Sequence, residues 1–178
     1  MGQARLALPS EIKLRDPALT LRNPASLYHK LNHLLALLAG LLRPLFLLVI
    51  RLYWGWQFFL TGKGKLMNLD RPTDYFASLH IPFPRFNAIL VGSTEMIFGL
   101  LFLAGLGGRV VPLPLMTLLV VAYITSEQAA LHAFYSDPDK FLTATPFLFL
   151  YAVVIVFIFG PGKLSLDAVF EKKTSSAD

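Results

Sequence analysis

Cysteine is absent from the 178 residues of the chain. Its absence excludes disulfide bonds, zinc and iron–sulfur sites held by thiolates, c-type haem attachment and any Cys-x-x-Cys redox pair. Charged residues are scarce as well, at 15% of the chain against about 25% in an average soluble domain. A chain with so little charge is not expected to fold as an ordinary water-soluble domain.

Apolar residues dominate the composition, since 55% of the chain is hydrophobic and the mean hydropathy is +0.59. A helix needs about 20 apolar residues to cross a bilayer, so one domain of this length has room for about three to five spans. The net charge of +5 could suggest nucleic acid. In a membrane chain, however, excess Lys and Arg mark the cytoplasmic, anionic side of the bilayer, so no nucleic-acid partner is expected.

The pattern predicts an all-α integral membrane four-helix bundle with an N-terminal interfacial helix. Residues 1–43 are expected to form a cytoplasmic tail and, over 24–42, that interfacial helix, with no secretory signal peptide in evidence. Residues 44–170 are expected to form the membrane domain, and residues 171–178 a polar C-terminal tail. The expected spans are 44–62, 86–106, 112–131 and 146–160, with a short helix inside the 63–84 connection and a basic tail helix capped by Ser165.

The distribution of basic residues predicts the orientation of these spans. Outside the spans, ten Lys and Arg residues lie on the side of the termini and five on the opposite side. Lys and Arg are retained in cytoplasmic loops. We therefore predict a multi-pass protein of the inner (cytoplasmic) membrane with both termini in the cytoplasm.

Two helical faces combine small residues with charge. At 3.6 residues per turn, each face forms one stripe, and because small residues let helices approach closely, we expect the two stripes to pack together. Arg51 and Glu95 lie at similar estimated depths and are expected to pair. The pair is either a structural ion pair or a polar site that binds a ligand or handles a proton. The stripes are Arg51, Gly55, Phe58, Gly62 and Lys65 on the first span, and Ala88, Gly92, Glu95 and Gly99 on the second.

Other polar and aromatic side chains have simpler interpretations. Lys63 and Trp54 suit the outer membrane interface, where long basic side chains and aromatic rings gather. His80, in the outer loop, is either exposed or a hydrogen-bond donor to a ligand. His29 and His33 are spaced to chelate a metal but have no acidic neighbour in the sequence, so no metal site is expected.

Four segments together resemble the DoxX family, a group of small four-helix bacterial and archaeal membrane proteins. The resemblance covers residues 44–170 and implies a link to quinone-dependent redox chemistry. It places Arg51, Lys65, Glu95 and Arg109 on the family's characteristic polar positions, and leaves open whether Lys63 or Lys65 is the counterpart in "GKGK". The segments are "RLYWGWQFFLTGKGKL", "STEMIFGLLFLAGLGGR", "VAYIT" and "GPGKLSLD".

Two functional hypotheses follow. In the first, the chain is a subunit of a quinone-linked redox complex, in which Arg51 or Lys65 donates to a quinone carbonyl, Glu95 handles the proton and Trp54 helps to wall the site. No covalently bound cofactor is expected, and electrons would come from a partner, so the chain would not be catalytic alone. In the second, the chain is a non-catalytic accessory subunit of a larger membrane complex, contacted through residues 1–43. A transporter is disfavoured because no inverted repeat is evident.

Overall fold

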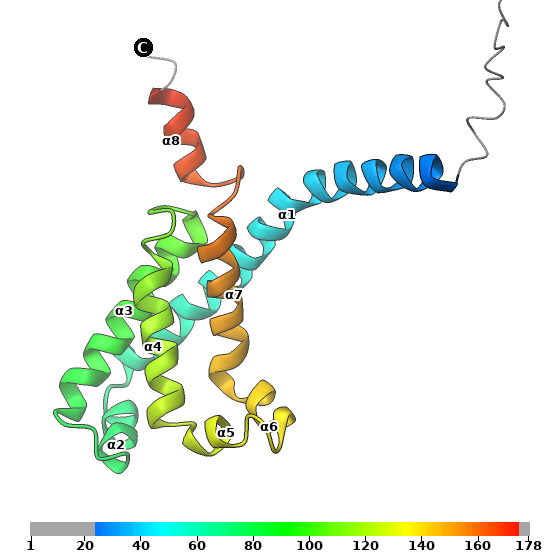
Figure 1. Cartoon of the computed structure of the whole chain (residues 1–178). Coiled ribbons are helices and arrows are strands. Elements are labelled where there is room, and N and C mark those ends of the chain that lie inside the picture. Colours follow the sequence, from blue (N-terminus) through cyan, green and yellow to red (C-terminus); the bar gives the residue numbers. More distant parts are fainter. Residues whose placement is uncertain (1–23, 175–178) are drawn as a thin grey trace, which may run out of the picture. The chain divides into compact units, whose positions relative to one another are not determined.

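A computed structural model of the chain describes residues 24–174, and the expected tail of residues 1–23 lies outside the described residues. The described part consists of helices joined by turns and short loops (Figure 1). It divides into an N-terminal unit, residues 1–41, and a C-terminal unit, residues 42–178. The helices are α1 (Pro24–Met67), α2 (Asp70–Ser78), α3 (Pro84–Ala104), α4 (Pro112–Thr125), α5 (Gln128–His132), α6 (Pro138–Thr143), α7 (Thr145–Phe159) and α8 (Leu166–Thr174).

Helix α1 passes through Pro44 without a break, so the expected helix start at this proline is wrong. Residues 24–42 are helical as expected, and their place at the membrane interface stays a prediction. An internal proline removes one backbone hydrogen bond and costs about 3 kcal/mol in a helix interior. The flanking segments, "LLALLAGLL" and "LFLLVI", are rich in strong helix formers. In an apolar setting, a break would leave further backbone groups without partners, which favours one continuous helix.

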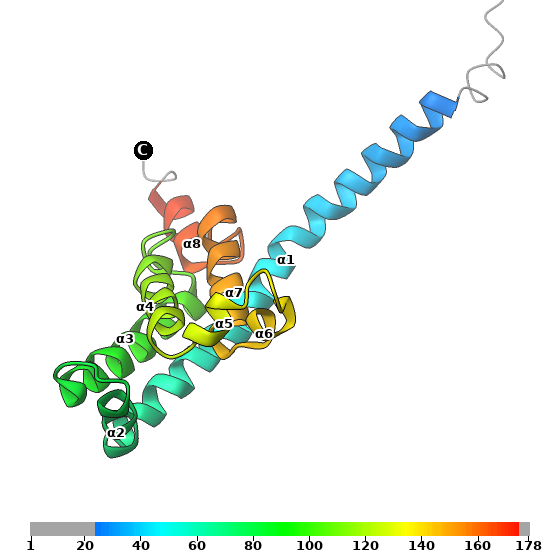
Figure 2. The same cartoon turned by 60° about the horizontal axis from the view of Figure 1, so that its bottom comes forward.

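Within the C-terminal unit, the end of α1 runs alongside α3, α4 and α7. Helices α2, α5 and α6 gather at one end of this group, and α8 lies at the other end (Figures 1 and 2). Helix α4 packs against both α3 and α7. The four long elements share one apolar core that includes Phe58, Phe102, Leu115 and Val153. The ring of Phe58 meets those of Phe102 and Phe149 edge-on, with centroids 6.4 and 4.9 Å apart.

Helix ends follow the turn residues of the sequence, with one exception. Helix α3 ends at Gly105, whose φ of +69° is the left-handed conformation that glycine adopts readily. The third helix, expected to run to residue 131, ends at Thr125, and α5 begins after Ser126 and Glu127. Glu127, which falls inside the expected span 112–131, therefore lies beyond the end of α4. The turn expected at "FYSDPDK" contains the first residues of α6.

Two of the described helices are long and apolar enough to cross a membrane: α1 over 26–67 and α3 over 84–104. Helices α4 and α7 are apolar but have only 14 and 15 residues. Large apolar side chains are exposed on all four, including Leu52, Leu100, Val121 and Leu148. The all-α fold is therefore as expected, whereas the bundle of four spans stays a prediction.

Glycines hold α1 and α3 in close antiparallel contact. A Cβ added at Gly62 would lie 2.5 Å from the carbonyl oxygen of Gly92, and one at Gly99 would lie 2.7 Å from the Cβ of Phe58. A Cβ at Gly55 would similarly lie 2.7 Å from the Cβ of Leu103. Real side-chain carbons do not approach so closely, so the helices touch only because these positions lack a side chain. The expected packing of the two small-residue stripes is confirmed.

Candidate polar cavity between the helices

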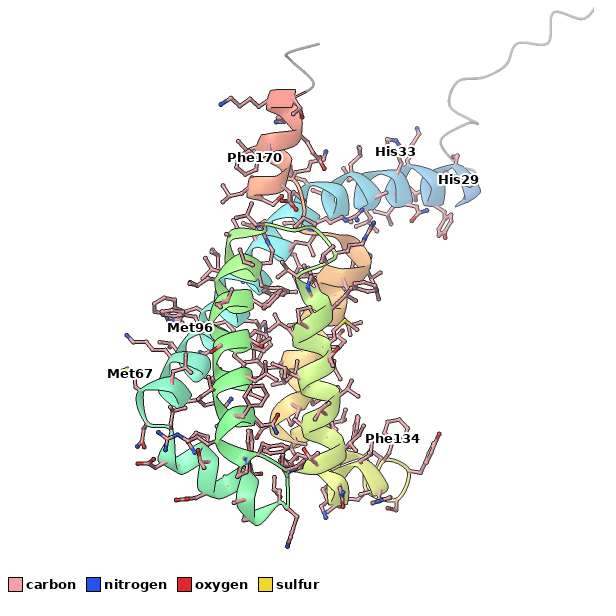
Figure 3. All side chains as sticks on the ribbon, turned by 90° about the vertical axis from the view of Figure 1, so that its left-hand side faces the viewer. His29, His33, Met67, Met96, Phe134 and Phe170 are labelled. Atoms are coloured by element: carbon pink, nitrogen blue, oxygen red, sulfur yellow. The ribbon has the colours of Figure 1, made fainter. Side chains whose placement is uncertain are left out.

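Lys65 and Glu95 form an ion pair where α1 and α3 approach each other. The Lys65 ammonium donates to both carboxylate oxygens of Glu95, with Nζ to Oε1 and Oε2 distances of 2.6 and 2.5 Å. The Lys65 side chain is 30% exposed and that of Glu95 is 13% exposed. Met67 and Met96, labelled in Figure 3, follow the two residues closely in sequence and show their place on α1 and α3. The pair settles which lysine of "GKGK" faces the second helix, because Lys63 is exposed.

The local sequence explains why this pair forms. Lys65 lies one helical turn after Gly62, and Glu95 lies one turn after Gly92. Gly62 contacts the backbone of α3 near Met96. Because backbone contact brings the helix axes together, the lysine side chain reaches the carboxylate across a short gap.

Arg51 does not pair with Glu95, and that prediction is wrong. Arg51 is 1% exposed, and its guanidinium packs against Gly105 at the end of α3. Gly105 is ten residues from Glu95, which is about 15 Å along a helix. Similar depths for Arg51 and Glu95 require a span that starts at Pro44, whereas α1 has no start there.

The segment that leads into α8 supplies the partners of Arg51. Its Nη2 donates to the carbonyl oxygen of Leu164, while Nε and Nη1 are buried without a hydrogen-bond partner among the described residues. The carboxylate of Asp167 accepts hydrogen bonds from the backbone N–H groups of Gly107 and Gly108, at 3.1 and 2.5 Å. These contacts tie the start of α8 to the α3–α4 turn. Arg51 thus links the end of α3 to the segment before α8.

The Lys65–Glu95 pair lines a cavity of about 380 Å³ in the C-terminal unit. Residues from α1, α2, α3, α4 and α7 contribute to its walls, which are mostly apolar and aromatic. The charged lining residues are Lys65, Glu95 and Glu127. The other lining residues are Phe58, Thr61, Pro72, Tyr75, Phe76, Ile81, Asn87, Val91, Leu118, Leu119, Val121, Ala122, Thr125, Ser126, Thr145, Pro146 and Phe149.

Glu127 is the cavity residue that sequence reasoning did not select. It follows α4 and comes to the cavity because the helix stops at Thr125. The sequence feature that could have identified Glu127 is an acidic residue in an otherwise apolar stretch, because such a charge usually lies at the end of a span or in a functional site. In the structure, Glu127 lies just after α4 and also lines the cavity.

The remaining candidate residues lie outside the cavity lining. Trp54 packs edge-on against Phe149, with ring centroids 4.7 Å apart, and so supports the wall from behind. Arg109 is exposed, and its Nε donates to the carbonyl oxygen of Phe157 at 3.1 Å, near the end of α7. His80 is exposed, just after α2, with a φ of +57°.

The histidines of α1 lie in the N-terminal unit. His29 and His33, labelled in Figure 3, are one helical turn apart and are both exposed. Across residues 24–174, no group of three or more His, Asp or Glu side chains is arranged to hold a metal ion.

Comparison with known protein families gives a match that includes most of the cavity lining, but not its residues on α7. The DoxX family model matches residues 46–128, which include Lys65, Glu95 and Glu127 as well as Arg51. The matched segment is shorter than the 44–170 over which the sequence resembles the family. Comparisons with curated proteins and with solved structures found no match. The match over residues 46–128, together with the exposed apolar helices, supports a membrane protein similar to the DoxX family.

Proposed function

We propose that the cavity binds the head group of a quinone and that the chain serves as a membrane subunit of a quinone-linked redox complex. The observation that carries this proposal is a charged pair set into the wall of a largely apolar cavity. Small-molecule sites typically enclose about 300–1,000 Å³ and combine apolar walls with a few placed polar groups. A cavity of about 380 Å³ suits a single ring.

The residues present fit such a head group. Phe58, Phe76 and Phe149 offer aromatic walls for a flat ring. The Lys65 ammonium has three N–H donors. Two of them donate to the carboxylate of Glu95, and the third remains free for a ligand. That N–H can donate to a quinone carbonyl, while Glu95 can hold a proton beside it. A bound quinone would supply two-electron, two-proton chemistry, and the electrons would come from a partner redox subunit.

Binding of a short-chain benzoquinone to the full chain in lipid nanodiscs, measured by calorimetry, tests the proposal. Lys65→Met combined with Glu95→Leu removes both charges together and should lower the affinity at least tenfold, the value of about one charge-assisted hydrogen bond. Lys63→Met is the matched control, because Lys63 is exposed on the same helix two positions away. Equal quinone affinity in wild type and in the double variant would contradict the proposal.

An accessory, non-catalytic role is the second candidate, and the N-terminal unit favours it. On this part of α1, Leu27, Leu31, Leu34, Leu38 and Leu41 recur at alternating spacings of four and three, and all are exposed. Such a heptad pattern is typical of a helix that packs against another helix. We propose that residues 1–43 contact another membrane subunit through this seam.

Purification from native membranes in mild detergent tests the second candidate. Leu34→Ala combined with Leu41→Ala removes two side chains from the seam. Leu35→Ala combined with Leu42→Ala is the control, because those two leucines are also exposed but lie off the seam. Stoichiometric partner subunits should be lost from the first variant alone. Equal recovery of partners with both variants would contradict a role for the seam.

A further inference from the structure

Glu127 is the one cavity carboxylate without a hydrogen bond or ion pair to any residue of the described part of the chain. Lys65 and Glu95 neutralise each other. The charged groups that line the cavity therefore leave one negative charge in excess, and that charge belongs to Glu127. A carboxylate beside apolar walls is stabilised by a hydrogen-bond donor, and none of the described residues supplies one.

Three neutral polar side chains of the cavity each use a donor within the protein, whereas the hydroxyls of Tyr75 and Thr145 donate to no described residue. The hydroxyl of Thr61 donates to the carbonyl oxygen of Phe58 at 3.0 Å, and that of Thr125 donates to Val121 at 2.8 Å. The side-chain amide of Asn87 donates to the carbonyl oxygen of Pro82 at 2.7 Å. None of these donors is directed to Glu127, which remains a strong acceptor without a donor. Only a ligand that carries a donor can pair with this carboxylate.

We propose that the cavity prefers the reduced, hydroxyl-bearing quinol over the quinone, with the Glu127 carboxylate accepting a hydrogen bond from a ligand hydroxyl. This inference rests on the proposed quinone site. It specifies which redox form of the ligand the cavity binds more tightly. A quinone presents two carbonyl acceptors, one of which can take the remaining Lys65 N–H, but neither can satisfy Glu127. A quinol presents two O–H donors. A site built to pair with a hydroxyl discriminates strongly against the analogue that lacks it.

Anaerobic calorimetry on the full chain in nanodiscs measures the preference directly. The probes are a short-chain benzoquinone, its chemically reduced quinol and benzylamine, an aromatic cation that would also satisfy a free carboxylate. The wild type should bind the quinol about tenfold more tightly than the quinone, as one hydrogen bond to a charged group implies. Glu127→Gln should lower quinol affinity about tenfold, since the neutral amide is a weaker acceptor, and should leave quinone affinity equal or higher.

Glu171→Gln is the matched control, because it makes the same chemical change at an exposed position on α8, outside the cavity lining. It should leave the quinol-to-quinone affinity ratio unchanged, and thermal melting should show all variants folded. Equal binding of quinol and quinone by the wild type, or an unchanged ratio in Glu127→Gln, would overturn the inference while leaving the quinone site standing. Tighter binding of benzylamine than of quinol would overturn it in favour of a cation site. Binding of no probe would overturn both the inference and the proposed function.

Discussion

Lys65 and Glu95 depend on each other because both side chains are mostly removed from solvent. Desolvation penalises each charge, and the bidentate contact offsets that penalty. Removing one partner leaves the other charge without compensation, whereas removing both leaves no charge to stabilise. This asymmetry separates the pair from an exposed surface ion pair, which contributes little.

Lys65→Met alone should destabilise the folded chain by about 1–3 kcal/mol, because it strands the Glu95 carboxylate. Lys65→Met combined with Glu95→Leu should recover most of that loss. The measurement is the midpoint of thermal unfolding in detergent, followed by helical circular dichroism. A double variant less stable than the single variant would show that the two charges do not act as a unit.

Gly105 is held beside the buried Arg51 in a left-handed conformation. Gly105→Ala should destabilise the chain by more than about 1–2 kcal/mol, the cost of that backbone conformation for a non-glycine residue, because the new methyl group also overlaps the guanidinium. Gly64→Ala is the control, since nothing lies near Gly64 on α1, and it should stabilise the helix by up to about 1 kcal/mol. Unfolding midpoints of the two variants that shift alike would contradict this role for Gly105.

At the residue scale, helical spacing was enough to predict that Lys65 and Glu95 lie on facing stripes. It was not enough to assign the partner of the carboxylate. Arg51 and Lys65 lie on the same stripe of α1. Which of them reaches Glu95 therefore depends on the relative position of α1 and α3 along their axes. The backbone contacts of Gly62 and Gly99 fix that position, and spacing within one helix carries no information about it.

At the scale of elements, the glycines make the contact between α1 and α3 sensitive to single methyl groups. Gly62→Ala should separate the two helices, lengthen the Lys65–Glu95 contact and destabilise the chain by about 1–3 kcal/mol, as overpacking does. Gly64→Ala on the same helix is again the matched control. The midpoint of thermal unfolding in detergent, compared between the two variants, reports the loss of packing. Equal midpoints in Gly62→Ala and Gly64→Ala would count against close packing at this position.

The helix bounds show which sequence signals were decisive. The prolines and glycines that flank α3 and α7 predicted their ends closely, because their backbone preferences act locally. Ser165 caps α8 as expected, with its Oγ accepting from the N–H of Ala168 at 3.2 Å. Pro44 led to a wrong helix start because a long apolar helix can accommodate an internal proline. The end of α4 was missed because no glycine or proline marks Thr125.

At the scale of the whole molecule, the orientation across the membrane is a separate prediction. The absence of native cysteine allows single cysteines to be introduced and labelled without background. Asp74→Cys, on α2, should react with a membrane-impermeant maleimide from the outside of intact cells. Lys173→Cys, on α8, should react only after the membrane is opened. Labelling of position 74 from the cytoplasmic side alone would overturn the predicted topology.

Composition alone predicted a helical membrane chain, because too few charges remain to cover a water-exposed surface. It did not predict the number of crossings, since the apolar content of the third and fourth segments is high while their helices are short. Residues 1–23 and 175–178 lie outside the described structure. The expected contact of residues 1–43 with another subunit stays a prediction.

The shortness of α4 and α7 has a consequence for the surrounding lipid. Helices of 14 and 15 residues extend about 21–23 Å, whereas the hydrocarbon layer is about 30 Å thick. In the predicted bundle of four spans, local thinning of the bilayer is one way to relieve such a mismatch, and it draws head groups and water inward beside the short helices. Thr125 and Thr145, where α4 ends and α7 begins, both line the cavity. A thinned bilayer would therefore bring the aqueous boundary to the polar wall, where protons can be exchanged, while a lipid-soluble ligand approaches from the acyl chains.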